Sequence, residues 1–207
     1  MAKYHDYIFN LERREFLGKF EEMYQAELVE NFDAHGQDSL GRIDLQITKI
    51  LVDSINPTKI VDIGSGKGLL TSLLNGRGRT IFGSDISETA LKIARRRDPE
   101  ITYVHLPDSS LDSLTSFLLR CNKELGSVDV VVMSQVVSYI ERWKDLIEFA
   151  LTHSSGICIA TYLPENPIGF VADWGELCSA VDSRAVIQYS MWDSIRRTGW
   201  LLATRQD

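Results

Sequence analysis

The sequence has few cysteines, and their number and spacing argue against two kinds of protein. Cys121, Cys158 and Cys178 are odd in number and show no paired C-x-x-C spacing. Disulfide frameworks and cysteine zinc sites both need such pairing, so we expect buried free thiols in a reducing compartment and no metal site. Long apolar runs are also absent, and the charged N-terminus has no signal-peptide core. We therefore expect a cytoplasmic protein with no membrane partner.

Basic residues are scarce relative to acidic ones. The chain has 22 Lys and Arg against 29 Asp and Glu, which gives a net charge of −7. Such a balance repels a phosphate backbone unless the cations gather on one face, so nucleic acid is not an expected partner. The 207 residues suffice for one sizeable core, which predicts a single domain. The oligomeric state is not set by the sequence, which leaves a homodimer open.

Hydrophobic periodicity divides the chain into a helical leader and a body of alternating strands and helices. The leader has helical spacing over residues 11–32, followed by a loop, and Ser39 is a candidate N-cap for a second helix that ends near Ser54. Five apolar runs of strand length follow: KIVDIG, RTIFGSD, ITYVHL, VDVVVMS and GICIATYL. The expected helices between and after them cover residues 68–75, 87–96, 111–124, 141–151 and 173–180.

These β-branched runs, separated by helices, are typical of strands buried on both faces of a parallel sheet. Two further runs, AVIQYSMW and GWLLATRQ, are too close together for a helical crossover. We therefore expect an antiparallel hairpin at the sheet edge. The predicted fold is α/β and doubly wound, with seven mostly parallel strands.

The stretch KIVDIGSGKGLL forms a glycine loop directly after the first predicted strand of the body. Gly64, Gly66 and Gly68 let the backbone approach a ligand closely, and the following helix points free N–H groups at it. A dinucleotide fingerprint has its third glycine where this chain has Leu69. Asp62 is also an unusual neighbour for a pyrophosphate. From these residues alone, a dinucleotide, another adenosine cofactor and a simple turn all remain open.

The loop VDIGSGKG resembles motif I of the class I S-adenosylmethionine-dependent methyltransferases, a fold with a Rossmann-like core. Asp85 after the second strand corresponds to the family's ribose-binding acidic residue, and Asp108 after the third to its adenine-binding residue. VDVVVMSQVVSYI is similar to the segment that closes over the cofactor. The resemblance implies S-adenosyl-L-methionine as cofactor, one domain over residues 1–207, a helical cap over 1–38 and a Rossmann-like core over 39–207. It implies these cofactor-binding residues: Arg42, Asp62, Gly64, Ser65, Gly66, Asp85, Ile86, Asp108, Ser109 and Gln135.

The methyl acceptor is less well defined by the sequence. Gln135 and Tyr139 are the candidate catalytic residues, although an amide is no general base. Tyr24, His35 and Trp174 are candidates for the acceptor pocket. The leader also resembles small methyltransferases of bacterial glycan and natural-product pathways, including the nodulation-factor N-methyltransferase type. The expected partner is a polar small molecule, methylated on nitrogen or oxygen, with a saccharide or amino sugar as first choice.

Two other functions remain open at this stage. A non-catalytic cofactor-binding or scaffold subunit is compatible with Gln135 and the missing base. An NAD-dependent oxidoreductase on the same architecture is disfavoured by Asp62 and Leu69.

Overall fold

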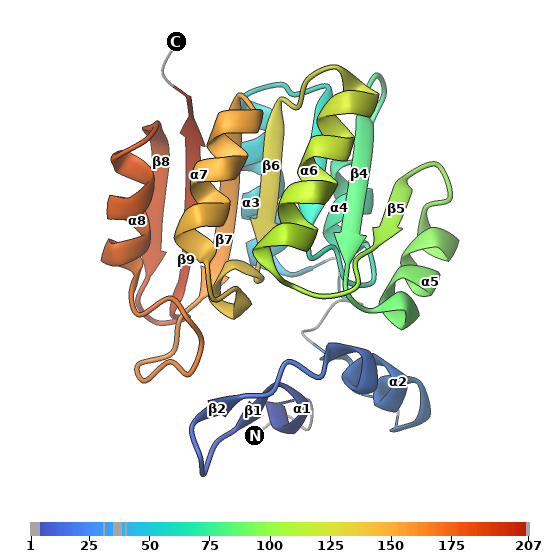
Figure 1. The fold of residues 1–207 in the computed structure, drawn as a ribbon, viewed down its shortest axis with the longest axis vertical. Coiled ribbons are helices and arrows are strands. Elements are labelled where there is room, and N and C mark those ends of the chain that lie inside the picture. The colour runs from blue at the N-terminus through green and yellow to red at the C-terminus, as the bar shows by residue number, and fades with distance from the viewer. Residues whose placement is uncertain (1–4, 31, 35–38, 40, 206–207) are drawn as a thin grey trace.

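The computed structural model describes residues 5–30, 32–34, 39 and 41–205 of the chain. Figure 1 shows a central sheet with helices on both faces and a smaller N-terminal leader beneath one edge of that sheet. The sheet consists of β3 (Lys59–Ile63), β4 (Thr80–Asp85), β5 (Thr102–His105), β6 (Val130–Ser134), β7 (Gly156–Tyr162), β8 (Val186–Asp193) and β9 (Thr198–Thr204). Its helices are α3 (Ile43–Ser54), α4 (Leu69–Leu74), α5 (Glu88–Arg97), α6 (Leu111–Leu125), α7 (Trp143–His153) and α8 (Trp174–Asp182), with the 3-10 helix η2 (Val137–Tyr139) after β6.

The strand order confirms the predicted doubly wound sheet. The seven strands lie in the order β5-β4-β3-β6-β7-β9-β8. Strands β3 to β7 pair in parallel, whereas β9 is antiparallel to both β7 and β8. The chain runs outward from β3 to β5 and then crosses to β6, so strand order reverses between β3 and β6. A crevice at the carboxyl ends of these two strands is the expected ligand site.

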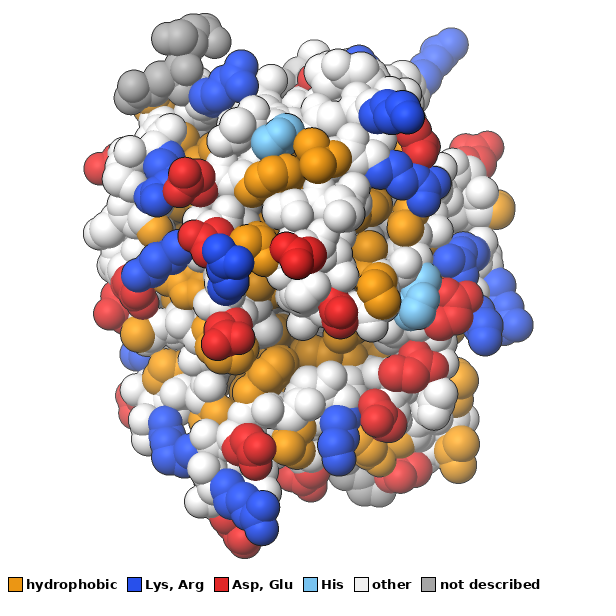
Figure 2. Space-filling view, in the orientation of Figure 1, with side chains coloured by type: hydrophobic (Ala, Val, Ile, Leu, Met, Phe, Trp, Pro, Cys, Tyr) orange, Lys and Arg blue, Asp and Glu red, His pale blue; other side chains and the backbone are white. Residues whose placement is uncertain are grey.

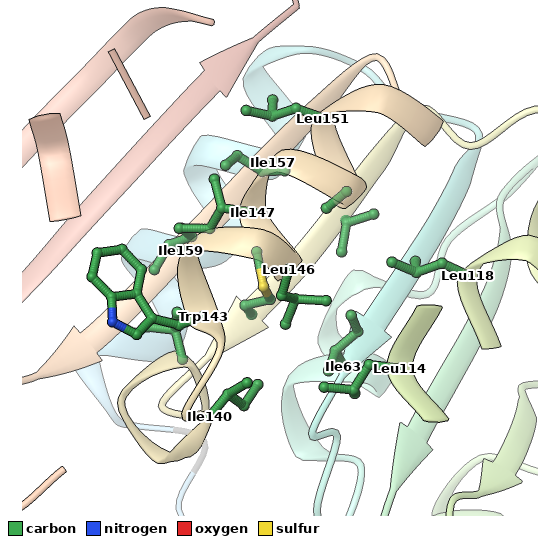
Figure 3. Close-up of a cluster of buried hydrophobic side chains, with 14 of the residues drawn as sticks. Ile63, Leu114, Leu118, Ile140, Trp143, Leu146, Ile147, Leu151, Ile157 and Ile159 are labelled. Carbon is green, nitrogen blue, oxygen red and sulfur yellow. The ribbon is translucent and has the colours of Figure 1, made fainter. Parts of the chain in front are cut away.

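Alternate residues of each central strand enter one of two hydrophobic cores. In β6, Val131 and Met133 face α6, α7 and α8, whereas Val130 and Val132 face α3, α4 and α5. Figure 3 shows the first core, in which side chains of α6 and α7 converge on β3 and β7. Burial on both faces explains why the strands read as continuous apolar runs.

The leader differs from the single helix predicted over residues 11–32. It contains α1 (His5–Ile8), a hairpin of β1 (Phe9–Asn10) and β2 (Glu15–Phe16), and α2 (Phe20–Glu30). The turn between β1 and β2 places Arg14 at a φ of 52°, which a continuous helix does not allow. Helical spacing of the aromatic residues was therefore misleading over the first half of this segment.

The other helices lie within a few residues of their predicted positions. Ser87, Ser110 and Asp173 are N-caps whose side chains accept hydrogen bonds from backbone N–H groups in the first turns of α5, α6 and α8. The prediction of Ser39 as the cap of α3 was wrong, because that helix begins at Ile43 with Arg42 in the cap position. This shift places Arg42 at the carboxyl edge of the sheet.

Two further features bear on the predicted class of protein. Cys121 and Cys158 are buried, and Cys178 is partly buried. Burial raises the pKa of Cys158 to about 12, so its thiol stays protonated. Among the helices of the described residues, none combines the length and the apolar character that crossing a bilayer requires.

The core around α7 gives a test of the fold. Leu146 is fully buried between α7 and the sheet, as Figure 3 shows, whereas Leu119 on α6 is 49% exposed. We expect Leu146→Ala to lower the free energy of unfolding by about 2–5 kcal/mol because it leaves a cavity. Leu119→Ala is the matched control and should change it by less than about 1 kcal/mol. Equal losses in urea unfolding would contradict this assignment of the core.

Candidate functional site

The glycine loop after β3 has a backbone that only glycine adopts easily at three positions. Gly64, Gly66 and Gly68 have φ values of 72°, 53° and 74°. A Cβ atom on Gly64 would lie 2.6 Å from Val136, and one on Gly68 would lie 2.6 Å from the Tyr103 hydroxyl. The loop is therefore pressed against the ends of neighbouring strands and has no room for side chains at these two positions.

Asp85, at the end of β4, joins that strand to the glycine loop. Its Oδ2 accepts a hydrogen bond from the Gly66 N–H at 2.8 Å, and its Oδ1 accepts one from the Ser87 N–H at 2.9 Å. Burial raises the pKa of Asp85, against the effect of these backbone hydrogen bonds. Each carboxylate oxygen keeps a second lone pair for a ligand hydroxyl. Ser87, and not Asp85, caps α5.

Asp62, within β3, is the second buried carboxyl group at this edge. Its Oδ2 accepts a hydrogen bond from the Thr71 hydroxyl at 2.6 Å. Burial raises the pKa of Asp62 to about 7, and the charge of Asp85 acts in the same direction. A ligand with a cationic group favours the ionised form of such a carboxyl group.

A cavity opens between this loop and the leader. Leader side chains Phe20 and Tyr24 lie on one side of it, and the ends of β3, β4 and β6 lie on the other. Its free volume is about 110 Å³, well below the roughly 300 Å³ at which small-molecule pockets begin. Entry of a nucleoside therefore requires the leader side chains to move. The residues lining this cofactor cavity include Arg42, Asp62, Gly64, Ser65, Asp85, Ile86, Leu106, Ser109, Leu114, Gln135, Val136 and Tyr139.

A buried ion pair fastens the leader to the glycine loop. Lys67 lies between Gly66 and Gly68, and its side chain is only 2% exposed. Its Nζ contacts Glu27 of α2 at 2.5 Å and Asp33 at 3.0 Å. Burial raises the pKa of Glu27, and the hydrogen bond from Lys67 opposes that shift. Lys67 therefore ties the position of the leader to the conformation of the glycine loop.

A second polar contact holds the leader over α5. Glu21 of α2 accepts hydrogen bonds from the Ser87 hydroxyl at 2.7 Å, the Thr89 hydroxyl at 2.6 Å and the Thr89 N–H at 3.1 Å. Although burial acts in the opposite direction, the hydrogen bonds from Thr89 and Ser87 lower the pKa of Glu21 to about 2. Its carboxylate also lies near the N-terminus of α5, where negative charge is favoured.

A second, larger cavity of about 750 Å³ adjoins the first. It lies between the leader, the loop after β7 and the turn that joins β8 to β9. Among the described residues, Arg42, Gln135 and Tyr139 line both cavities. The Tyr139 ring is held by leader aromatics: it stacks on Phe16 at 5.7 Å and meets Phe20 edge-on at 5.3 Å. Figure 2 shows hydrophobic side chains gathered in the hollow between the body and the leader.

Most of the predicted cofactor residues meet in the cofactor cavity. Gly66 contributes through its N–H bond to Asp85 and is not a lining residue. Asp108 is exposed and accepts hydrogen bonds from Ser110 and Ser113 at the start of α6, which lower its pKa. Arg42 lines the cavity, but its guanidinium is paired with Asp44.

The predicted acceptor residues are not brought together. Tyr24 is 4% exposed and lines the cofactor cavity. Trp174 lines neither cavity and stacks on Trp192 at 6.0 Å. His35 lies outside the described residues.

Sequence reasoning missed the residues of the leader that contact the loop. No role was predicted from the sequence for Lys67, Glu21 or Glu27. Glu27 and Lys67 are 40 positions apart, and no local pattern pairs them. The one available signal was a lysine inside a loop that is otherwise glycine and small residues.

The residues of the cofactor cavity fit S-adenosylmethionine. Asp85 offers acceptor lone pairs for ribose hydroxyls, and the Ser65 hydroxyl is buried without a hydrogen-bond partner in the structure. Ile86, Leu106 and Leu114 provide apolar surface for an aromatic base. Asp62, whose pKa burial raises to about 7, would ionise beside a cationic group.

The strand order, the antiparallel β9 inserted between β7 and β8, and the glycine loop after β3 define the fold of class I S-adenosylmethionine-dependent methyltransferases. Residues 61–153 match the family model described as a methyltransferase domain. The family match covers less than half of the chain, and the structures that share its fold include ones with bound SAM or SAH, so the fold and the cofactor class are those of S-adenosylmethionine-dependent methyltransferases.

Individual relatives are distant. A ubiquinone biosynthesis O-methyltransferase of Thiobacillus denitrificans is 34% identical over 85 residues, 40% of this chain and 33% of that protein. An N-demethylindolmycin N-methyltransferase of Streptomyces griseus is 36% identical over 77 residues, 36% of this chain and 30% of that protein. The chain thus spans about a third of the length of these two relatives.

Solved structures share the fold over more of the chain. Magnesium protoporphyrin IX methyltransferase of Synechocystis with bound SAM has a TM-score of 0.60 at 17% identity, covering 100% of this chain and 98% of that one. The N-terminal domain of EvdMO1 with SAH has a TM-score of 0.58 at 17% identity, covering 81% and 83%.

The ion pair of Lys67 gives a test of leader attachment. Lys67→Met leaves two carboxylates without their cation, so we expect it to lower the free energy of unfolding by about 3–5 kcal/mol. Adding Glu27→Met should recover part of that loss, as a double-mutant cycle measures. Lys49→Met is the control, because Lys49 pairs with Asp53 on the surface of α3 at 34% exposure. Additive losses for Lys67 and Glu27 would contradict the coupling.

The raised pKa of Asp62 predicts a pH dependence of stability. Folding favours the protonated carboxyl group, so this group's contribution is complete below about pH 4 and is lost as pH rises to about 7. Asp62→Asn keeps the acceptor for Thr71 and cannot ionise. Relative to the wild type, we expect it to gain on the order of 2–4 kcal/mol in unfolding free energy between pH 4 and pH 8. Parallel pH curves from urea unfolding of the two proteins would contradict the assignment.

Proposed function

We propose that this chain transfers the methyl group of S-adenosylmethionine to a nitrogen or oxygen atom of a polar small molecule. The observation that carries the proposal is the meeting of two cavities at Gln135 and Tyr139. One cavity has the glycine loop and the Asp85 carboxylate for the cofactor, and the other has the volume of a small-molecule pocket.

The sulfonium of the bound cofactor supplies a methyl group that is already activated for displacement. The protein's task is therefore to align the two reactants and to exclude water. Asp85 and the backbone of the glycine loop would hold the cofactor, and Asp62 in the same cavity would offer a carboxyl group for its positive charge. Tyr139 lies at the junction of the two cavities, and Phe20 and Tyr24 line the cofactor cavity.

The acceptor remains a proposal at the level of chemical class. The sequence favoured a saccharide, an amino sugar or a related metabolite. The two curated relatives described above are named for one O- and one N-methylation, on different molecules. Their names do not choose between the two atoms for this chain.

Cofactor binding gives the first test, through the role of Asp85. Asp85→Asn removes the charged acceptor of the ribose hydroxyls, so we expect S-adenosylmethionine affinity to fall about ten- to a hundredfold by calorimetry. Asp129→Asn is the matched control, because Asp129 also accepts two backbone N–H bonds, from Thr58 and Lys59, and lines neither cavity. The control should bind S-adenosylmethionine as the wild type does.

Three outcomes would count against the proposal. Wild-type protein that does not bind S-adenosylmethionine at millimolar concentration would overturn it. A stabilising effect of a nicotinamide cofactor on thermal unfolding would instead favour the oxidoreductase. Tight cofactor binding without turnover on any acceptor, together with a co-purifying protein, would favour a non-catalytic subunit.

A further inference from the structure

The side chain of Gln135 is fixed by β7 in an orientation that matters for chemistry. The side-chain Oε1 accepts a hydrogen bond from the Tyr162 N–H at 2.8 Å. The backbone N–H of Gln135 donates to the Ala160 carbonyl at 2.7 Å. A backbone N–H only donates, so the partner atom on Gln135 must be the amide oxygen. Gln135 itself has a φ of 60°, an unusual backbone conformation for a side chain of this size.

The other polar group of Gln135 is its amide NH2, which only donates, while its oxygen keeps one further lone pair beside the β7 backbone. Gln135 lines both cavities, so this donor lies where cofactor and acceptor meet. An oxygen nucleophile accepts such a hydrogen bond with one lone pair and attacks with another. A neutral amine has a single lone pair, which the reaction needs, and its N–H groups need an acceptor. The geometry of Gln135 thus favours an oxygen nucleophile.

Among the residues that the structure describes, the junction of the cavities has no general base either. The shared residues Arg42, Gln135 and Tyr139 include no carboxylate and no imidazole. The nearby carboxyl groups are engaged: Asp44 pairs with Arg42, Asp62 accepts from Thr71, and Asp85 accepts from backbone N–H groups.

His5 lines the larger cavity and is not among the residues that line both. Burial lowers its pKa, although Asp6 opposes that shift. Without a base among these described residues, the acceptor hydroxyl must lose its proton by its own acidity. A phenol, with a pKa near 10, does so far more readily than an alcohol, whose pKa is close to that of water at about 16.

The walls of the larger cavity suit a flat ring. Aromatic and proline side chains from the leader, η2, β7, the loop after it and β9 line it: Phe9, Tyr139, Tyr162, Trp200, Pro164 and Pro167. Its charged lining comprises Arg42, Asp44 and Arg196, with His5. Arg196 is held by Asp193 in the turn between β8 and β9. Among the described lining residues, Asp44 is the single carboxylate, so a cationic amine finds no unpaired counter-charge.

We propose that the acceptor is a phenolic hydroxyl on a planar aromatic ring, and that Gln135 donates a hydrogen bond to the phenolic oxygen. This proposal rests on the methyl transfer proposed above. The phenolic oxygen forms a bond to the methyl carbon, the carbon–sulfur bond breaks, and its electron pair goes to the sulfur. The phenolic proton passes to water. Gln135 stabilises the oxygen while it carries negative charge.

The acceptor class is tested with defined probes at saturating S-adenosylmethionine. We use 3,4-dihydroxybenzoate and 4-hydroxybenzoate as phenols, with D-glucose and D-glucosamine as the saccharide alternatives. We expect methylated product from a phenol at a rate at least about tenfold above either sugar. Calorimetric binding of S-adenosylmethionine, measured in parallel, tests the proposed function separately. Binding followed by methylation of a sugar and not of a phenol would overturn the acceptor class and leave methyl transfer standing.

The role of Gln135 is tested with Gln135→Glu, which keeps an acceptor for the Tyr162 N–H and replaces the donor by a negative charge. We expect kcat/KM for the phenol to fall about ten- to a hundredfold, and its rise with pH to move to higher pH. Gln188→Glu is the matched control on β8, where Gln188 bonds to Thr204 outside both cavities. An unchanged pH profile in Gln135→Glu, with kcat/KM equal to that of the control, would overturn the assignment.

Discussion

The close approach of the glycine-loop backbone to its neighbours is the constraint on which the rest of the site depends. Gly64 abuts Val136 after β6, Gly68 abuts Tyr103 of β5, and the Gly66 N–H holds the Asp85 carboxylate at the end of β4. A side chain at either end of the loop would separate strands that must meet at one edge. The loop therefore sets the relative positions of the ends of β3, β4 and β6, and with them the cofactor cavity.

The same loop also determines where the leader lies. Lys67 points away from the cofactor cavity lining and into Glu27 of α2, while Glu21 of the same helix binds the start of α5. The contact of Lys67 joins buried charged groups, whose removal one at a time is costly, whereas Glu21 is held by hydroxyl and N–H donors. Phe20 and Tyr24 lie on this helix and line the cavity. Entry of the cofactor therefore depends on the position of the leader.

Much of the body could be predicted from the sequence, because its signals are local. Apolar runs defined the strands, and Ser87 and Ser110 capped the helices that follow β4 and β5. The leader could not be predicted in the same way. Its hairpin depends on a positive φ at Arg14 and on contacts with Tyr139, which is distant in sequence. For the same reason the pocket residues were harder to predict than the cofactor residues, which lie at strand ends.

Gln135 illustrates how a residue that looks unsuited to catalysis acquires a chemical role from its surroundings. An amide can accept or donate, and the sequence does not say which. The hydrogen bond from the Tyr162 N–H holds its oxygen against the β7 backbone and leaves the NH2 group as a donor. A site that donates and has no base among its described residues does not create a nucleophile; it stabilises an oxygen that has ionised on its own. Under the acceptor proposal above, selection among acceptors follows from the acidity of the hydroxyl as well as from the shape of the cavity.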